Sequence, residues 1–198
     1  MLLRMLALVN LVACVPVLTS PPGTEPGAAA DWVAPENSWG VCEGPPATLE
    51  GTGLDVGEVA PDFLFLDQHG AEVSLWQFHG CTVVLDFSTG WCGPCQQLAS
   101  EAQAIADDFR DDGVRYLTVM PQNVRTDIPE VADLVEWGDS FALFEPILQD
   151  DEGYTYELVK EPRGFPAVLI LNTDGVVVDD VLPVISDETI RAAIEDAL

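Results

Sequence analysis

The sequence contains very few basic residues. Seven lysines and arginines stand against 34 aspartates and glutamates in 198 residues, and the formal net charge is -27. Such a chain repels nucleic acid and anionic lipid surfaces, so neither is expected as a direct partner. The acids are spread along the whole chain and form no single tail. This distribution favours a role in solubility, or adaptation to a salty medium, over a site for a cationic partner.

The nitrogen and sulfur ligands of metal ions are also scarce. The chain has two histidines, three methionines and five cysteines, and neither His69 nor His79 belongs to a cluster of possible ligands. The acidic run at 150–153 lacks the alternating ligand spacing of a dedicated calcium loop. A structural zinc site needs a second pair of ligands at ordinary spacing, which the chain does not offer. We therefore expect no bound metal.

No apolar run is long enough to span a bilayer. The stretch 1–13 is mostly apolar with Arg4 near its start, which is typical of a secretory signal. Leu11-Val12-Ala13-Cys14 resembles the lipobox of bacterial lipoproteins, in which Cys14 would be lipidated. The alternative is an ordinary signal peptide that is cut near Thr19-Ser20 or further on. Both predict export, and a lipidated Cys14 would tether the protein to a bacterial membrane.

Composition divides the chain into three parts. We expect a signal at 1–19, a flexible tether and irregular extension at 20–56, and one domain at 57–198. The tether is rich in Pro, Gly and Ala. The extension carries Trp32 and Trp39, which indicate that it packs on the domain without regular structure.

The chemistry of the chain is concentrated in residues 91–95, Trp-Cys-Gly-Pro-Cys. An apolar strand at 82–88 precedes this motif, and a helical pattern at 96–110 follows it. Pro94 suits the first turn of a helix, which places the Cys92 sulfur beside free backbone N–H groups and the positive end of the helix dipole. Both stabilise a thiolate, and Cys95 can then resolve a mixed disulfide. We interpret the pair as redox-active; half of a zinc site and an inert disulfide are the alternatives.

Asp86 is the only charged residue in the apolar strand. A carboxylate buried in a covered sheet costs several kcal/mol unless it is protonated or hydrogen-bonded, so its pKa should be raised. Such a group suits a proton acceptor for Cys95 near neutral pH. The alternative is a solvent-facing acid on an edge strand.

The rest of the domain alternates between strands and helices. We expect a β-hairpin from 63–66 and 71–74, a strand at 114–120, a helix at 129–137, a second hairpin from 167–171 and 176–182, and a final helix at 187–197. The turn at 172–175 joins the second hairpin. Ser186 is expected to cap the last helix.

These motifs together resemble the thioredoxin superfamily. The motif at 91–95 is similar to the thioredoxin active site, and Asp86, six residues before Cys92, matches that family's buried acid. Gly164-Phe165-Pro166 is similar to the cis-proline loop that faces the dithiol. The leader at 59–80 resembles the branch of membrane-anchored thiol-disulfide oxidoreductases and of proteins related to alkyl hydroperoxide reductase and thiol-specific antioxidant.

The resemblance implies a fold and roles for the site residues. The expected α/β fold is a central mixed β-sheet flanked by helices, with an N-terminal β-hairpin extension. Cys92 would attack, Cys95 would resolve, and Asp86 would assist proton transfer. The substrate surface would be shaped by Trp91, Pro94, Phe165 and Pro166; for Phe165, core packing is the alternative. Thioredoxins often pair the buried acid with a lysine on a neighbouring strand, and 116–119 offers none.

Two cysteines remain once Cys14 and the active-site pair are assigned. Leftover cysteines tend to pair in an oxidising compartment. We therefore predict a structural disulfide between Cys42 and Cys81, which would pin the extension to the start of the central strand. Sequence alone does not fix the geometry, and two unrelated thiols are the alternative.

We expect an exported thiol-disulfide oxidoreductase that reduces protein disulfides. It needs no cofactor, because the dithiol itself carries the electrons. The Gly-Pro pair inside the motif resembles the reducing members of the family. By resemblance, the electron donor would be a membrane or periplasmic thiol carrier, and the substrates would be disulfide-containing exported proteins such as an apocytochrome c.

Three other functions are alternatives on this fold. A peroxiredoxin-like thiol peroxidase would carry a proline and a threonine upstream of its cysteine; Thr89 is at the right offset, but Leu85 stands where the proline belongs. A non-enzymatic binding module would be expected to have lost one of the two cysteines. A copper metallochaperone could hold Cu(I) with the dithiol, although the chain has no Met- or His-rich cluster.

Overall fold

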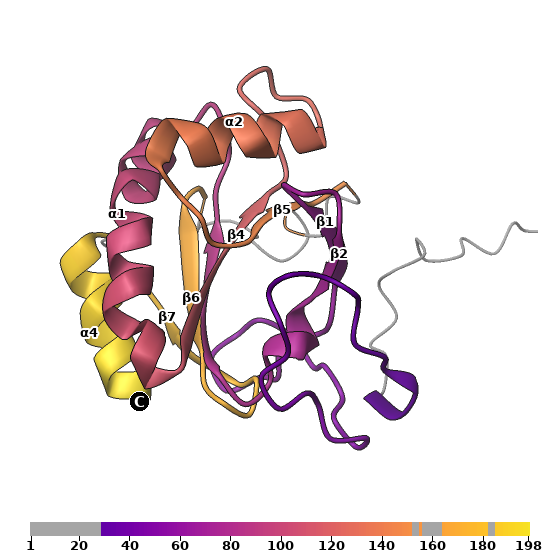
Figure 1. The fold of residues 1–198 in the computed structure, drawn as a ribbon. Coiled ribbons are helices and arrows are strands. Elements are labelled where there is room, and N and C mark those ends of the chain that lie inside the picture. Colours follow the sequence, from indigo (N-terminus) through magenta and orange to yellow (C-terminus); the bar gives the residue numbers. More distant parts are fainter. Residues whose placement is uncertain (1–28, 152–154, 156–163, 182–184) are drawn as a thin grey trace, which may run out of the picture.

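The computed structural model describes residues 29–151, 155, 164–181 and 185–198 (Figure 1). The predicted signal, the lipidation of Cys14 and the first part of the tether lie outside these residues. Within the described ranges, no helix is both long and apolar enough to cross a membrane.

A mixed sheet forms the centre of the molecule. Within the described residues its strands follow the order β2-β1-β5-β4-β3-β6-β7. The strands are β1 (Leu64–Asp67), β2 (Glu72–Ser74), β3 (Thr82–Phe87), β4 (Val114–Met120), β5 (Ile147–Gln149), β6 (Ala167–Leu171) and β7 (Val177–Asp180). β3 is parallel to β4 and antiparallel to β6, and all its residues are buried. Asp86 therefore lies on an interior strand, which excludes the edge-strand alternative.

Helices cover one face of this sheet. Figure 1 shows α1 (Gly93–Phe109), α2 (Val131–Phe141) and α4 (Asp187–Ala197) on the same side of the strands. Apolar residues of α1 recur on one side of the helix, as predicted. The buried ones include Leu98, Ala102, Ile105, Ala106 and Phe109. They share a core cluster with residues of α2, α4 and the facing strands. Burial of this stripe fixes α1 along the sheet and so positions its N-terminus.

The opposite face is covered by the N-terminal extension. The described part of the extension contains the 3-10 helix η1 (Ala29–Asp31) and is otherwise irregular. The 3-10 helix η2 (Leu75–Phe78), which follows β2 in the domain, packs in the same cluster. The Trp32 indole N–H donates to Ser74 Oγ at 2.9 Å, and the Trp39 indole N–H donates to Asp67 Oδ2 at 2.6 Å. A disulfide joins Cys42 to Cys81, just before β3, with a Cα–Cα distance of 5.9 Å. The extension is thus packed on the domain.

Two sequence-based expectations differ from the structure. The helix predicted at 129–137 instead runs over Val131–Phe141, because the Glu130 N–H is bound by Asp133 Oδ2 at 2.8 Å at the start of the helix. The helix ends at Ala142, which has a left-handed φ of 51°. Strand β5 was not anticipated, since three residues are too few to show an alternating pattern.

Candidate active site

The two motif cysteines lie where β3 leads into α1. Cys92 is the N-cap of α1 and is 4% exposed, while Cys95, in the first turn, is fully buried. A disulfide joins them with a Cα–Cα distance of 5.2 Å. The Cys95 backbone N–H donates to Cys92 Sγ at 3.2 Å. Of the two sulfurs, Cys92 Sγ therefore receives both a backbone N–H and the helix dipole, which favours its thiolate in the reduced protein.

The loop before β6 faces the dithiol. The Phe165–Pro166 peptide bond is cis, and Cys92 Sγ lies 3.4 Å from the Phe165 carbonyl oxygen. Pro166 is buried, whereas Phe165 is half-buried and packs against both core clusters. The structure therefore brings Pro166 and Phe165 to the reactive sulfur, and part of the Phe165 ring does serve core packing.

Trp91 and Pro94 form the exposed rim of the dithiol. Trp91 is 47% exposed, and its indole N–H donates to Gln122 Oε1 at 2.8 Å. The Trp91 ring meets the Phe165 ring edge-on, with a centroid distance of 6.4 Å. These contacts hold a large apolar surface beside an otherwise buried disulfide, which suits docking of a polypeptide. Gln122 was missed by sequence reasoning, because its role depends on the loop after β4.

Asp86 is buried beneath this site. Val84, two residues earlier and therefore on the same side of β3, packs in the core cluster that contains Cys95. Burial raises the pKa of Asp86 from its ordinary value of 3.8 to about 6, because an ionised carboxylate loses its hydration. The carboxylate is thus mostly ionised at neutral pH and can accept a proton there.

Two hydroxyl groups bind the Asp86 carboxylate. Ser88 Oγ donates to Oδ1 at 2.7 Å, and the Tyr116 hydroxyl donates to Oδ2 at 3.1 Å. These bonds lower the pKa of Asp86 and offset part of the effect of burial. Burial and the neighbouring carboxylate raise the pKa of Tyr116 well above its usual value, so Tyr116 stays a neutral donor. Neither residue was identified from the sequence. Ser88 follows Asp86 by two residues, which is compatible with the same side of the strand, and Tyr116 lies on the neighbouring strand β4.

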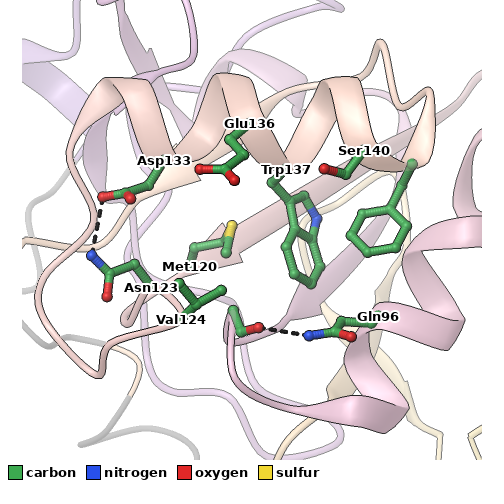
Figure 2. A pocket seen from close by; sticks show the side chains of 10 residues that line it. Gln96, Met120, Asn123, Val124, Asp133, Glu136, Trp137 and Ser140 are labelled. Carbon is green, nitrogen blue, oxygen red and sulfur yellow. Dashed lines mark hydrogen bonds between the residues drawn. The ribbon is translucent and has the colours of Figure 1, made fainter.

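Two hollows flank the dithiol. A groove of about 530 Å³ lies between the start of α1 and the start of α4, and Pro94, Phe165 and Pro166 line it. A smaller pocket of about 240 Å³ lies on the other side, between α1 and α2 (Figure 2). The residues predicted to contact substrate therefore converge on the larger groove, apart from Trp91, which lines neither hollow.

The sheet, the capped dithiol and the cis-proline loop define the class of this protein. It is a thioredoxin-like thiol-disulfide oxidoreductase. The chain belongs to the AhpC/TSA family, whose model matches residues 56–179.

Named relatives agree with this class. The thioredoxin-like protein YneN of Bacillus subtilis is 28% identical over 127 residues, covering 64% of this chain and 71% of YneN. The thiol-disulfide oxidoreductase ResA of Bacillus thuringiensis is 27% identical over 131 residues, covering 65% of this chain and 70% of ResA. Both alignments reach more than two thirds of the relative.

Solved structures share the fold. The thioredoxin domain of a thiol-disulfide oxidoreductase from Bacteroides vulgatus superposes with a TM-score of 0.60 at 22% identity, covering 73% of this chain and 98% of that domain. A secreted disulfide oxidoreductase of Mycobacterium tuberculosis gives a TM-score of 0.55 at 19% identity, covering 68% and 95%. At these identities the likeness establishes the thioredoxin-like architecture and no finer property.

Proposed function

We propose that this protein reduces disulfide bonds of exported proteins. The observation that carries the proposal is the position of Cys92 Sγ, which caps α1 and lies 3.4 Å from the carbonyl oxygen of the cis-proline loop. A substrate disulfide that reaches this sulfur meets a stabilised thiolate and a backbone edge. The Gly93-Pro94 pair resembles that of reducing thioredoxins, and we therefore propose that electrons flow from the dithiol to the substrate.

The proposed cycle moves two electrons to the substrate. The Cys92 thiolate attacks one substrate sulfur, the substrate S–S bond breaks, and the leaving thiolate takes a proton from solvent. The Cys95 thiol then gives its proton to Asp86 and attacks Cys92 Sγ. This step forms the Cys92–Cys95 disulfide and releases the second substrate sulfur as a thiolate, which takes a proton from solvent, while Asp86 returns its proton to solvent. A dithiol donor restores the reduced pair by the reverse exchange.

The groove on the α4 side is the proposed substrate surface. Its lining residues Pro94, Phe165 and Pro166 offer apolar contacts, and Trp91 extends that surface beyond the groove. The Phe165 backbone can pair with an extended segment next to the substrate disulfide. Such contacts to the main chain suit a range of protein substrates.

The proposed setting is extracytoplasmic. Disulfides persist in oxidising compartments, so a stable Cys42–Cys81 bond fits export, as does the signal-like start of the chain. Lipidation of Cys14 would anchor the protein to a bacterial membrane. A membrane or periplasmic thiol carrier is the proposed donor, and an apocytochrome c is one proposed substrate.

The reduction potential of the Cys92–Cys95 pair tests the direction of electron flow. The full-length protein is equilibrated with glutathione buffers of defined ratio, and the thiols are titrated, with Cys92→Ser as the control. We expect a value near about -270 mV, as in thioredoxin. A value near about -120 mV would make the protein a disulfide-forming oxidant and reverse the proposal. Absence of a reversible titration would end the redox interpretation of the pair.

A further inference from the structure

The smaller pocket beside the dithiol is bounded by α2 on one side. Figure 2 shows the Trp137 ring extending from α2 into it, with Met120 from the end of β4 and Val124 from the following loop. These three side chains give the pocket an apolar surface. The Trp137 indole N–H has no hydrogen-bond acceptor within the described residues, although the side chain is only 5% exposed. A buried donor without an acceptor in a pocket wall is a group that a backbone carbonyl oxygen of a bound polypeptide can satisfy.

The charged groups that line the pocket are both acidic. Asp133 already accepts hydrogen bonds from Asn123 Nδ2 at 3.1 Å and from the Glu130 N–H at 2.8 Å, and Arg125 lies 3.6 Å from its other oxygen. Glu136 is exposed on the same helix and makes no hydrogen bond or ion pair with another described residue. The pocket therefore presents one free carboxylate above an aromatic and aliphatic surface, in a chain with a net charge of -27.

The pocket adjoins the reactive sulfurs. Gly90 and Gln96 line it, and the Gln96 side-chain amide donates to the Gly90 carbonyl oxygen at 2.9 Å. Gly90 precedes Cys92 by two residues, a distance of at most about 7.6 Å along the backbone. The Gly90 N–H also donates to the Gln122 carbonyl oxygen at 2.9 Å, which ties the pocket wall to the active-site loop. A polypeptide bound at Cys92 can therefore place a nearby side chain in this pocket.

We infer that the pocket binds a lysine or arginine side chain of the substrate polypeptide, two to four residues from the cysteine under attack. This inference rests on the proposed function and names its substrate class. The volume, about 240 Å³, is below the range of about 300–1,000 Å³ usual for small-molecule sites and fits one side chain. The aliphatic stem packs on Met120 and Val124, the cation lies against the Trp137 ring, and Glu136 neutralises it.

Peptides with one intramolecular disulfide test the inference. Three peptides differ only in the residue three positions from the first cysteine, which is lysine, glutamine or glutamate. Second-order rates of their reduction by the reduced full-length protein are measured at low ionic strength. We expect the lysine peptide to react about tenfold faster than the glutamate peptide. Glu136→Gln should bring the two rates within about twofold of each other.

Asp139→Asn is the matched control. Asp139 is an exposed acid on the same helix that does not line the pocket, so its substitution removes the same charge and should keep the preference. The inference would be overturned if the wild-type protein reduced the lysine and glutamate peptides at equal rates, or if Glu136→Gln and Asp139→Asn lost the preference equally. Either result would leave the proposed reductase function standing. If none of the peptides is reduced although the dithiol titrates reversibly, both the proposed function and the inference about the pocket fail.

Discussion

At the residue scale, the proposed proton transfer depends on the groups that bind Asp86. The carboxylate is bound by two neutral hydroxyls, from Ser88 and Tyr116. Thioredoxins, which this chain resembles, often pair this acid with a lysine on a neighbouring strand. A lysine would stabilise the ionised acid by charge, whereas hydroxyls do so only by hydrogen bonding, which is weaker. Burial is the largest cause of the raised pKa of Asp86, about 6, and the hydrogen bonds offset only part of it.

Substitution Tyr116→Phe should shift the pH dependence of the resolving step. The change removes a donor to the carboxylate, so the pKa of Asp86 rises further, by roughly half to one pH unit for a bond worth about 1 kcal/mol. In the proposed cycle the ionised form of Asp86 accepts the Cys95 proton, so the rate profile should move to higher pH. Stopped-flow measurement of mixed-disulfide resolution between pH 5 and 8 checks this. Asp86→Asn, the control, should remove this titration; an unmoved profile in Tyr116→Phe would show that the hydroxyl does not tune the acid.

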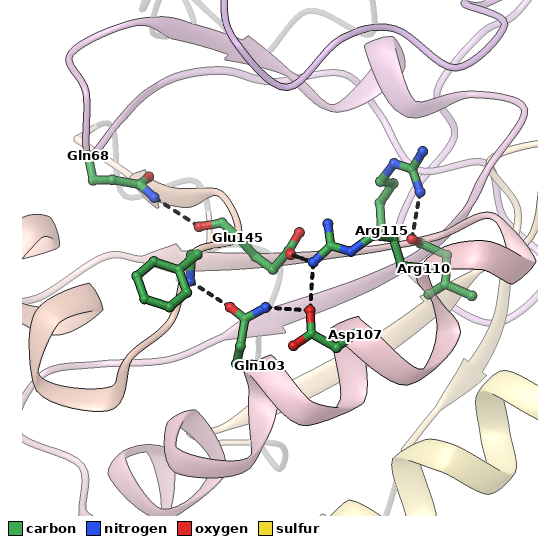
Figure 3. Close-up of polar contacts among 8 residues, drawn as sticks. Gln68, Gln103, Asp107, Arg110, Arg115 and Glu145 are labelled. Atoms are coloured by element: carbon green, nitrogen blue, oxygen red, sulfur yellow. Dashed lines mark hydrogen bonds and ion pairs between the residues drawn. The ribbon is translucent and has the colours of Figure 1, made fainter.

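At the element scale, the C-terminal end of α1 is clamped to the loop before β5 (Figure 3). Arg110, in the 3-10 turn η3 (Arg110–Asp112) that follows α1, binds Glu145 at 2.6 Å and Asp107 at 2.8 Å. Gln103 Oε1 accepts the Phe144 N–H at 2.6 Å. The Glu145 side chain is 8% exposed, whereas that of Asp107 is 58% exposed. The two ion pairs of Arg110 should therefore differ in importance.

Replacing Arg110 by methionine should lower the free energy of unfolding by about 1–3 kcal/mol. The variant leaves the Glu145 carboxylate buried without its cation, and the partial exposure of Arg110 keeps the loss below that of a fully buried pair. Asp107→Asn should change stability little, because both partners of that pair face solvent. Urea denaturation of both variants measures the difference. Equal losses of unfolding free energy in the two variants would mean that the burial of Glu145 does not determine how much the ion pair stabilises the protein.

At the scale of the whole molecule, the Cys42–Cys81 bond joins the extension to the sheet. Cys81 lies just before β3, and the active-site cysteines lie beyond its other end. The extension packs its two half-buried tryptophans against the core cluster on the face of the sheet that α1, α2 and α4 leave free. The bond is therefore placed to stabilise the domain without touching the redox centre.

The double substitution Cys42→Ser and Cys81→Ser should cost about 3–4 kcal/mol of stability. The estimate follows from the unfolded-state freedom that a cross-link over 39 residues removes. The reduction potential of the Cys92–Cys95 pair should stay unchanged. Urea denaturation of the oxidised protein and a glutathione titration provide the two measurements. A shifted potential would mean that the extension communicates with the dithiol.

Much of the fold could be predicted because its signals are local. The strand at 114–120 and the final helix at 187–197 carry clear periodicity, and the dithiol motif marks the strand-to-helix junction. The remainder depends on contacts between distant segments. Asp150 belongs to an acidic run of the sequence, yet it is fully buried and accepts the Thr155 N–H at 2.6 Å. The pocket beneath α2 likewise exists only once that helix packs near Gly90.

The N-terminal extension also has a consequence for self-association. An uncovered outer strand is a template on which a second chain can add its own strand and begin an aggregate. Here the Asn37 amide of the extension donates to the Glu72 carbonyl oxygen of β2 at 2.8 Å. Gly57 and Glu58, the first residues of the domain, exchange backbone hydrogen bonds of 2.8 Å with Val177 of β7. The extension thus covers part of one edge of the sheet, and the start of the domain covers part of the other. Covered in this way, the two outer strands should offer fewer free backbone groups to a strand from another copy.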